Sequence, residues 1–252
     1  MHTDGWPLLP DHRWTGTDHK ADGQRGAAIW LLKQFPDWHS SAGHAHPDAA
    51  SFIIYANGKV LTGDAGYAGV PMTEHHNSVL IDGKGQAVEG KGHDAFDGYP
   101  YERLDQLRIL ETKLSDKAAQ IRCDATSTYA AALGLTKFIR TFTLANGKFE
   151  ITDEFTASEP RIFTSFLHAD EKVEAAKDGE YLLRNGTAAL RVEVLTPQLK
   201  LRTEPNFLTA PGPPGSVDKG DRQQRGERLA IANGTPAQAV QFKVRLTPIS
   251  TP

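Results

Sequence analysis

Histidine and acidic side chains gather in two short stretches of this sequence, Gly43–Asp48 and His75–Asn77. In the first stretch His44, His46 and Asp48 occur at every second position. If that stretch is extended, the three side chains point to the same face of a strand. Imidazoles and carboxylates are common ligands of zinc. The residue types and their spacing therefore predict a metal site.

The segment between these stretches predicts how they are brought together. Two apolar runs within 50–64 flank Asn57-Gly58, a pair that favours the positive φ angles of a type I′ turn, so a β-hairpin is expected. The hairpin would carry Asp64 back toward His46. A third antiparallel pass through Asn77–Ile81 would bring His76 to the same end. We therefore predict that His46, Asp64 and His76 bind zinc or another divalent cation, with a fourth position for water or substrate.

The same residues also have simpler explanations. A single histidine is more often a structural residue than a ligand, and it is the clustering of several with an acid that favours a metal site. The glycine-rich stretch Gly83–Pro100 lacks the spacing of a phosphate-binding loop, and we interpret it as a rim beside the metal site.

Length and composition exclude several classes of protein. The chain has 252 residues and a net charge of −3, so it can bury a full core but shows no basic surface for nucleic acid. No apolar run approaches the length of a membrane span, and the start, Met1–Pro7, does not resemble a signal peptide. We expect a soluble protein. The single cysteine, Cys123, excludes an internal disulfide.

The remainder of the sequence predicts strands. Residues 1–26 form a polar lead-in, and 27–252 are expected to form one domain. Apolar and polar residues alternate or nearly alternate in many short runs after residue 105, for example Phe138–Leu144 and Phe149–Phe155. Turn signals separate these runs at Asn146-Gly147, Asp178-Gly179, Asn185-Gly186 and Asn233-Gly234. The predicted fold is all-β, a large antiparallel β-sandwich with few or no helices.

Several of these motifs resemble one known family, the heparinase II/III-like domain of polysaccharide lyases, over roughly residues 27 to 247. The resemblance rests on Gly43–Phe52, Asn57-Gly58 with Gly63–Gly66, and His76–Gly83, and more weakly on Arg140–Leu144, Glu150–Phe155 and Phe166–Asp170. It implies a β-sandwich that follows a helical (α/α) toroid, with the polysaccharide bound between the two. It also implies that His46, Asp64 and His76 bind zinc and that His44 faces the substrate.

Lyase chemistry on a uronate requires three groups: one that neutralises the carboxylate, a base for the C5 proton and an acid for the leaving oxygen. His44 is the candidate for neutralising the carboxylate or for removing the C5 proton, and His75, Arg103 or Arg108 could supply further positive charge nearby. Tyrosine often supplies the acid in such lyases. The predicted catalytic residues are His44, Tyr67, His75 and Tyr101, and the predicted substrate-binding residues are Tyr99, Arg103 and Arg108.

The expected partner is a uronate-containing polysaccharide or oligosaccharide, with no nucleic acid and no membrane. The family's toroid is absent from this sequence, so the chain is expected to be a stand-alone version, an excised domain, or a subunit whose partner, a toroid domain or a second copy, completes the cleft. The resemblance implies a periplasmic or secreted location. Two alternatives stay open: a non-catalytic carbohydrate-binding sandwich with a structural metal, and a cupin-like metal enzyme, although cupins place a glutamate where Ala49 and Ala50 stand.

Overall fold

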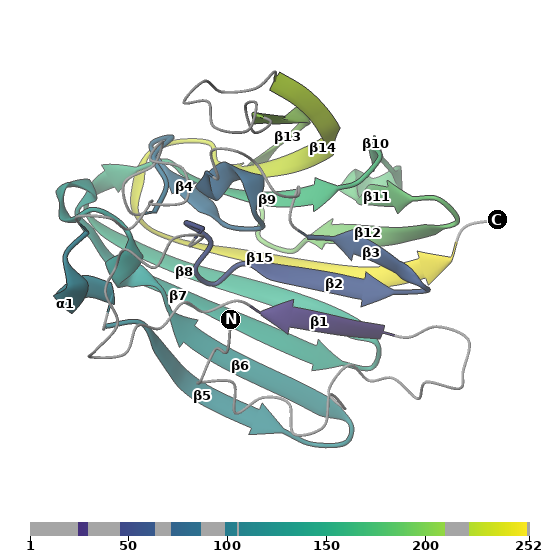
Figure 1. Ribbon diagram of the computed structural model, residues 1–252, viewed down its shortest axis with the longest axis horizontal. Coiled ribbons are helices and arrows are strands. Elements are labelled where there is room, and N and C mark those ends of the chain that lie inside the picture. Colours follow the sequence, from purple (N-terminus) through teal and green to yellow (C-terminus); the bar gives the residue numbers. More distant parts are fainter. Residues whose placement is uncertain are drawn as a thin grey trace, which may run out of the picture.

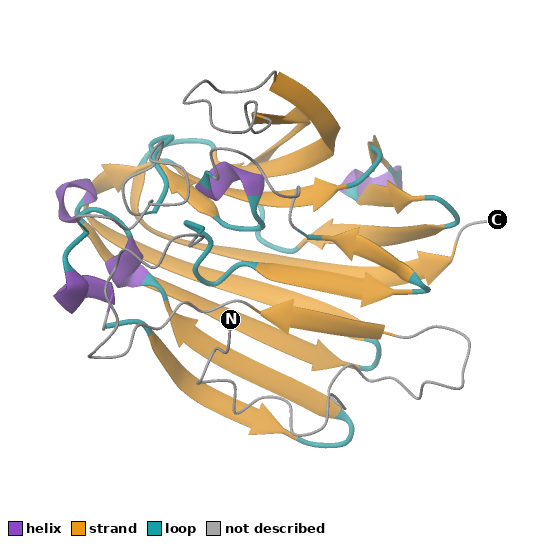
Figure 2. Ribbon diagram, viewed as in Figure 1, coloured by secondary structure: helices purple, strands orange, loops and turns teal. Residues whose placement is uncertain are grey.

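The computed structural model describes residues 25–29, 46–63, 72–86, 99–104, 106–209 and 222–250. Strands dominate these residues, as the ribbon coloured by secondary structure makes plain (Figure 2). One α-helix is described, α1 (Tyr101–Leu104), together with short 3₁₀ turns. The predicted all-β sandwich with few helices is confirmed. Among the described residues, no helix has the length and apolar character needed to cross a membrane.

The largest sheet contains eight antiparallel strands (Figure 1). In spatial order these are β10 (Val173–Ala175), β11 (Tyr181–Asn185), β12 (Ala188–Val194), β15 (Ala237–Ser250), β8 (Lys148–Arg161), β7 (Leu135–Ala145), β6 (Ala118–Asp124) and β5 (Arg108–Leu114). Side chains alternate along its central strands. On β8, Phe149, Ile151 and Phe155 are buried, whereas Glu150 and Glu154 lie on the opposite, solvent-facing side. One face of this sheet therefore forms a wall of the core.

Two smaller sheets are described beside the large one. The four-stranded sheet has the order β13 (Leu199–Thr209), β14 (Arg222–Asn233), β9 (Phe163–Ala169) and β4 (Val79–Ile81). The three-stranded sheet has the order β1 (Arg25–Ile29), β2 (Phe52–Ala56) and β3 (Lys59–Thr62). Aromatic rings join both to the large sheet: Phe155 stacks on Phe163 of β9 at 4.6 Å, and Phe52 of β2 meets Phe142 of β7 at 5.7 Å. Such ring pairs stabilise the packing beyond their buried area.

Local turn chemistry agrees with the sequence at two hairpins. Asn57 and Gly58 connect β2 to β3 with φ angles of 53° and 76°, and Asn146 and Gly147 connect β7 to β8 with 52° and 70°. Asparagine and glycine tolerate this left-handed conformation at little steric cost. Both of these predicted hairpins are therefore confirmed, and the predicted turn at Asn185-Gly186 likewise connects two antiparallel strands, β11 and β12.

Three expectations about the strands are wrong in the structure. The Val79–Ile81 pass pairs with β9 and not with the β2–β3 hairpin. Asn233-Gly234 is not a hairpin turn, because β14 and β15 belong to different sheets. Residues 46–50 form a turn and not a strand, with a hydrogen bond from Ser51 N to Asp48 O at 2.9 Å.

Candidate metal centre

Two histidines and one aspartate come together at the edge of the β2–β3 hairpin. His46, Asp48 and His76 each offer a ligand atom, and these atoms lie within 4.8 Å of one another. The rings of His46 and His76 are 5.3 Å apart and tilted by 50°. Ligand atoms of a tetrahedral zinc ion with bonds of about 2.0–2.2 Å lie roughly 3.4 Å apart. Small side-chain rotations would therefore be sufficient to bring the three ligand atoms to the spacing that zinc requires, and this donor set fits a zinc ion.

The turn that carries His46 and Asp48 is held in an unusual conformation. Ala50 has φ = 60°, a left-handed angle that costs a residue with a Cβ about 1–2 kcal/mol. The side chain of Gln86 stabilises the turn from one side: its Oε1 accepts from Ala49 N at 2.8 Å, and its Nε2 donates to Ala49 O at 2.9 Å. Because a strained backbone persists only where its surroundings determine it, this turn is a pre-organised element.

The second turn, which carries His76, is tied to the same glutamine. It begins with the 3₁₀ turn Thr73–His75 and continues to Ser78, whose N donates to His76 O at 2.7 Å. Gln86 N donates to Thr73 Oγ1 at 2.8 Å, and Gln86 Nε2 lies 3.1 Å from Ser78 Oγ. One buried residue thus contacts both ligand-bearing turns.

Asn77, next to His76, links this turn to two sheets. Its Nδ2 donates to Phe52 O of β2 at 2.8 Å, and its Oδ1 accepts from His168 N of β9 at 3.0 Å. Asn77 is fully buried. The buried amide therefore makes specific bonds on both of its ends, which is the condition for burying a polar group without a large cost.

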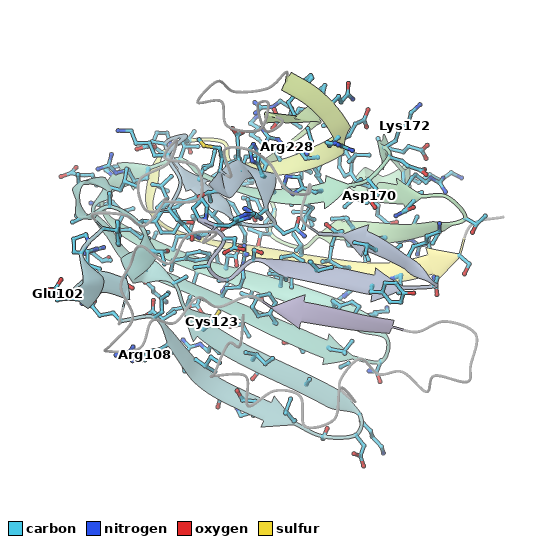
Figure 3. All side chains as sticks on the ribbon, viewed as in Figure 1. Glu102, Arg108, Cys123, Asp170, Lys172 and Arg228 are labelled. Carbon is cyan, nitrogen blue, oxygen red and sulfur yellow. The ribbon has the colours of Figure 1, made fainter. Side chains whose placement is uncertain are left out.

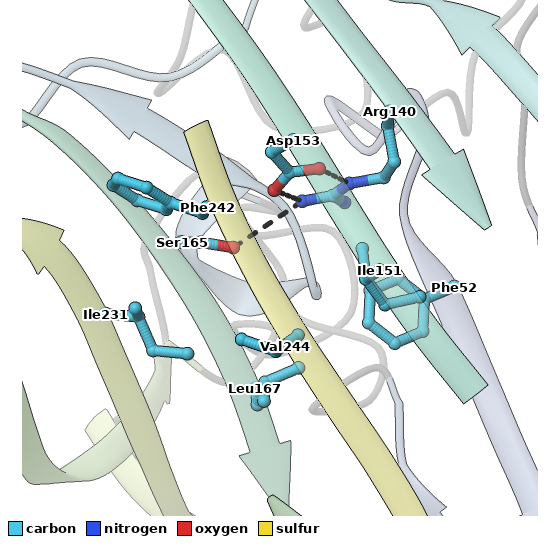
Figure 4. Close-up of a pocket in the computed structure, with 9 residues that line it drawn as sticks. All are labelled: Phe52, Arg140, Ile151, Asp153, Ser165, Leu167, Ile231, Phe242 and Val244. Carbon is cyan, nitrogen blue, oxygen red and sulfur yellow. Dashed lines mark hydrogen bonds and ion pairs between the residues drawn. The ribbon is translucent and has the colours of Figure 1, made fainter. Parts of the chain in front are cut away.

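A buried ion pair contacts the two turns, and Figure 4 shows its two side chains, Arg140 and Asp153. Arg140 of β7 and Asp153 of β8 face each other in register and are 0% and 2% exposed. Arg140 Nε and Nη2 donate to the two carboxylate oxygens at 2.6 and 2.7 Å. Burial alone would lower the pKa of Arg140, but the charge of Asp153 and the hydrogen bonds to it outweigh this and raise the pKa. The guanidinium is therefore charged at every working pH.

A small cavity of about 10 Å³ adjoins this pair, lined by Phe52, Ser165 and apolar side chains of β8, β9, β14 and β15 (Figure 4). A space of this size holds at most one water molecule. The cavity is therefore part of the core and not a substrate pocket.

The outer side of the His76 turn is anchored to the four-stranded sheet. Arg228 of β14, labelled in Figure 3, donates from Nη1 to Glu74 O at 2.9 Å and pairs with the Glu74 carboxylate at 2.8 Å. The Nε2 of His168 is 3.0 Å from the same Glu74 carbonyl oxygen. The turn is thus fixed from the β9–β14 side as well as from the core.

Of the three predicted metal ligands, the structure brings His46 and His76 together, and Asp64 lies outside the described residues. Asp48 is the carboxylate found beside them; it was grouped with His44 and His46 from its spacing but is not one of the three predicted ligands. Asp48 belongs to the same cluster of His and Asp residues in the sequence, although the alternating spacing that linked them applies to a strand and residues 46–50 form a turn.

The predicted catalytic residues are placed only in part. His44 and Tyr67 lie outside the described residues, and so does the side chain of Tyr101 in α1. His75 is buried, and its Nδ1 accepts a hydrogen bond from Met72 N at 3.1 Å, which closes the 3₁₀ turn. This contact gives His75 a structural role beside His76.

The predicted substrate-binding residues lie near α1. Tyr99 is buried, its hydroxyl is 2.7 Å from the carbonyls of Ser127 and Tyr129, and burial raises its pKa despite the nearby Arg103. Arg103 donates to Tyr129 O at 2.8 Å. Arg108, at the start of β5, is exposed (Figure 3). The contacts of Tyr99 and Arg103 are those of residues that fix a loop to the sandwich.

Comparison with known proteins finds a family model that matches this chain. The family model described as "Heparinase II/III-like, C-terminal" matches residues 35–213. Among curated proteins, the comparison found no match.

Solved structures with the same fold include a heparinase III gene product and the heparan sulfate lyase HepC from Pedobacter heparinus. The first has a TM-score of 0.64 at 15% identity and the second 0.64 at 13%; each alignment covers 90% of this chain and 33% of the other. A further heparinase III structure has a TM-score of 0.63 at 13% identity, with 91% and 35% covered. The chain thus spans about a third of the length of these structures. With most of its sequence matched by the family model, the chain belongs to the heparinase II/III-like, C-terminal family.

Proposed function

We propose that this chain is the β-sandwich of a polysaccharide lyase that binds one zinc-like divalent cation and acts on uronate-containing glycans by β-elimination. The observation that carries the proposal is the convergence of His46, Asp48 and His76 in a member of this family. His46 and His76 are the imidazole ligands. The carboxylate ligand is Asp64, as the family motif implies, or Asp48, which lies within reach, and the variants described below separate the two.

β-Elimination defines what the protein groups must do. The uronate carboxylate has to be neutralised, the C5 proton removed and the leaving oxygen protonated. When bound, the cation supplies a fixed positive charge and joins the two turns. His44, two residues before His46, is proposed to contact the substrate as the neutralising group or the base, and Tyr67 or Tyr101 to protonate the leaving oxygen.

The similar structures support the substrate class. Two are named heparinase III and one is named a heparan sulfate lyase, so the proposed substrate is a uronate-containing glycan of that kind. Because this chain spans about a third of those proteins, we propose that a second unit, a helical toroid or a second copy of the chain, forms the other wall of the glycan site.

The test is a screen of uronate-containing polysaccharides with the purified chain. Products are scored both for unsaturated ends by ultraviolet absorbance and for total reducing ends, which separates a lyase from a hydrolase. The proposal predicts unsaturated ends that disappear with His44→Ala. Asp170→Asn is the matched control, since this exposed carboxylate lies after β9 and contacts Asn185. Reducing ends without unsaturation would contradict β-elimination.

One observation favours a second function, a carbohydrate-binding sandwich with a structural cation. His76 is only 1% exposed, and buried ligands are typical of closed structural sites. This second function predicts binding of both cation and glycan without cleavage of any polysaccharide in the screen.

A further inference from the structure

The guanidinium of Arg140 uses all of its donors inside the core. Arginine carries five N–H groups in a fixed fork. Nε and one Nη2 proton bind the Asp153 carboxylate, and Nη2 also lies 3.5 Å from Ser165 Oγ. Nη1 donates to two backbone carbonyls, Ala50 O and Asn77 O, both at 2.8 Å. Any rotation of the guanidinium would therefore break at least one of these hydrogen bonds.

The two carbonyls belong to the two turns that carry the candidate ligands. Ala50 closes the turn that starts at His46 and Asp48, and Asn77 directly follows His76. Ala50 and Asn77 are 27 residues apart in sequence, and their turns lead into strands of different sheets, β2 and β4. A single nitrogen atom thus bridges two segments that no strand pairing holds together.

Two aromatic rings beside the guanidinium restrict it further. Arg140 lies over Phe52 at 5.6 Å and over Phe138 at 5.4 Å from its central carbon to each ring centroid. Cation–π contacts of this kind fix the plane of the guanidinium. Asp153 fixes the rotation within that plane, because it binds through both oxygens.

We infer that Arg140 is a positioning residue, which sets the separation of the His46 and His76 turns before a cation binds, and that Asp153 orients its guanidinium for this task. The inference rests on the proposed metal site and adds residues that touch neither the cation nor the substrate. Partners of this outer kind typically contribute 10–100-fold to metal affinity.

The decisive variant is Arg140→Lys. Lysine keeps the charge but has one nitrogen, which cannot bind Asp153 through both oxygens and also reach two carbonyls. The matched control is Arg245→Lys, because Arg245 likewise forms ion pairs, with Glu150 and Glu193, but on the solvent-facing side of the large sheet. Zinc affinity is measured by competition with a chelator on the full chain, with circular dichroism to confirm folding.

A second readout reports the turns without any metal. Hydrogen exchange is followed at the amides of Ser51, His76 and Ser78, each of which donates a hydrogen bond within its turn. Positioning by Arg140 predicts faster exchange at all three amides in Arg140→Lys and about 10–100-fold weaker zinc binding. Arg245→Lys should match the wild type in both measurements, since exposed ion pairs contribute little.

Each result decides the inference. Unchanged zinc affinity and unchanged exchange in folded Arg140→Lys would overturn it. If the wild type binds no zinc, the proposed metal site fails and the exchange data alone decide whether Arg140 holds the turns. If Arg140→Lys does not fold, the wild type is examined by NMR: slowly exchanging Arg140 Nη protons that shift when zinc is added support the inference, and Nη protons that exchange as fast as those of exposed arginines overturn it.

Discussion

Replacement of Asp153 by asparagine tests how the core supports the candidate site. Asparagine has nearly the same shape but offers one acceptor oxygen and an NH₂ group, which would face an N–H of Arg140. The loss of one charge-assisted hydrogen bond costs about 1.5–3 kcal/mol, and the donor left unsatisfied costs about 1–3 kcal/mol more. The sum agrees with the roughly 3–5 kcal/mol expected when a buried pair loses one partner. Asp153→Asn should therefore lower the free energy of unfolding by about 3–5 kcal/mol.

The assay is urea unfolding at neutral pH, followed by fluorescence and circular dichroism, with the slope compared between variants. Glu154→Gln is the control, because Glu154 is the next residue of β8 and pairs with Lys137 on the opposite, solvent-facing side. Its side chain is 29% exposed, so the expected loss is about 0–1 kcal/mol. If Asp153→Asn and Glu154→Gln lose the same free energy of unfolding, burial is not the reason why the Arg140–Asp153 pair stabilises the fold, and the reasoning is refuted.

Three further predictions concern other parts of the sandwich. Burial raises the pKa of the Cys123 thiol to about 12, so at pH 8 a thiol reagent should label the folded chain only as fast as it opens. Rapid labelling of the folded protein would contradict the burial. The thiol of the unfolded chain has a pKa of about 8.5, so the stability that the fold gains from the raised pKa of Cys123 is complete below that pH and declines as the pH rises toward 12. The hydrogen bond from Lys243, and then that from Arg245, lower the pKa of Glu150 although desolvation opposes them. The wild type should therefore be more stable than Glu150→Gln above about pH 4.3, and this difference should disappear as the pH falls through the lowered pKa. A difference that grows in acid would refute this assignment. Gly58→Ala should cost about 1 kcal/mol in unfolding experiments from backbone strain alone, since φ is 76° and a Cβ would meet no atom within 4 Å; a neutral effect would argue against the turn geometry.

Turns could be predicted from sequence where the chemistry is local. The conformations at Asn57-Gly58 and Asn146-Gly147 depend on the two turn residues and on adjacent apolar runs, and both predictions are confirmed. Asn233-Gly234 has the same letters, but whether its flanking strands pair depends on the rest of the fold. In the structure those strands enter different sheets.

The buried ion pair was predictable in principle. A two-residue turn at Asn146-Gly147 places Arg140 opposite Asp153, and both residues share the parity of the buried phenylalanines on their strands. A charge of each sign on the apolar face of two paired strands is a signal for a buried pair.

The nearness of His46 and His76 was predicted for a partly mistaken reason. A shared sheet was expected to bring them together, whereas β4 pairs with β9 and the two turns are joined by the side chains of Gln86, Asn77 and Arg140. Side-chain bridges between distant segments have no periodic pattern in a sequence. They follow from the packing of the sheets, which is decided by the whole chain.

Metal content is the most direct test of the central claim. The wild-type chain, dialysed against zinc and analysed for bound metal, is predicted to hold one ion per molecule. Both His46→Ala and His76→Ala should lose it while they remain folded, and of Asp48→Asn and Asp64→Asn the one that loses it identifies the carboxylate ligand. A wild type without bound metal, or histidine variants that keep the full metal content, would contradict the account.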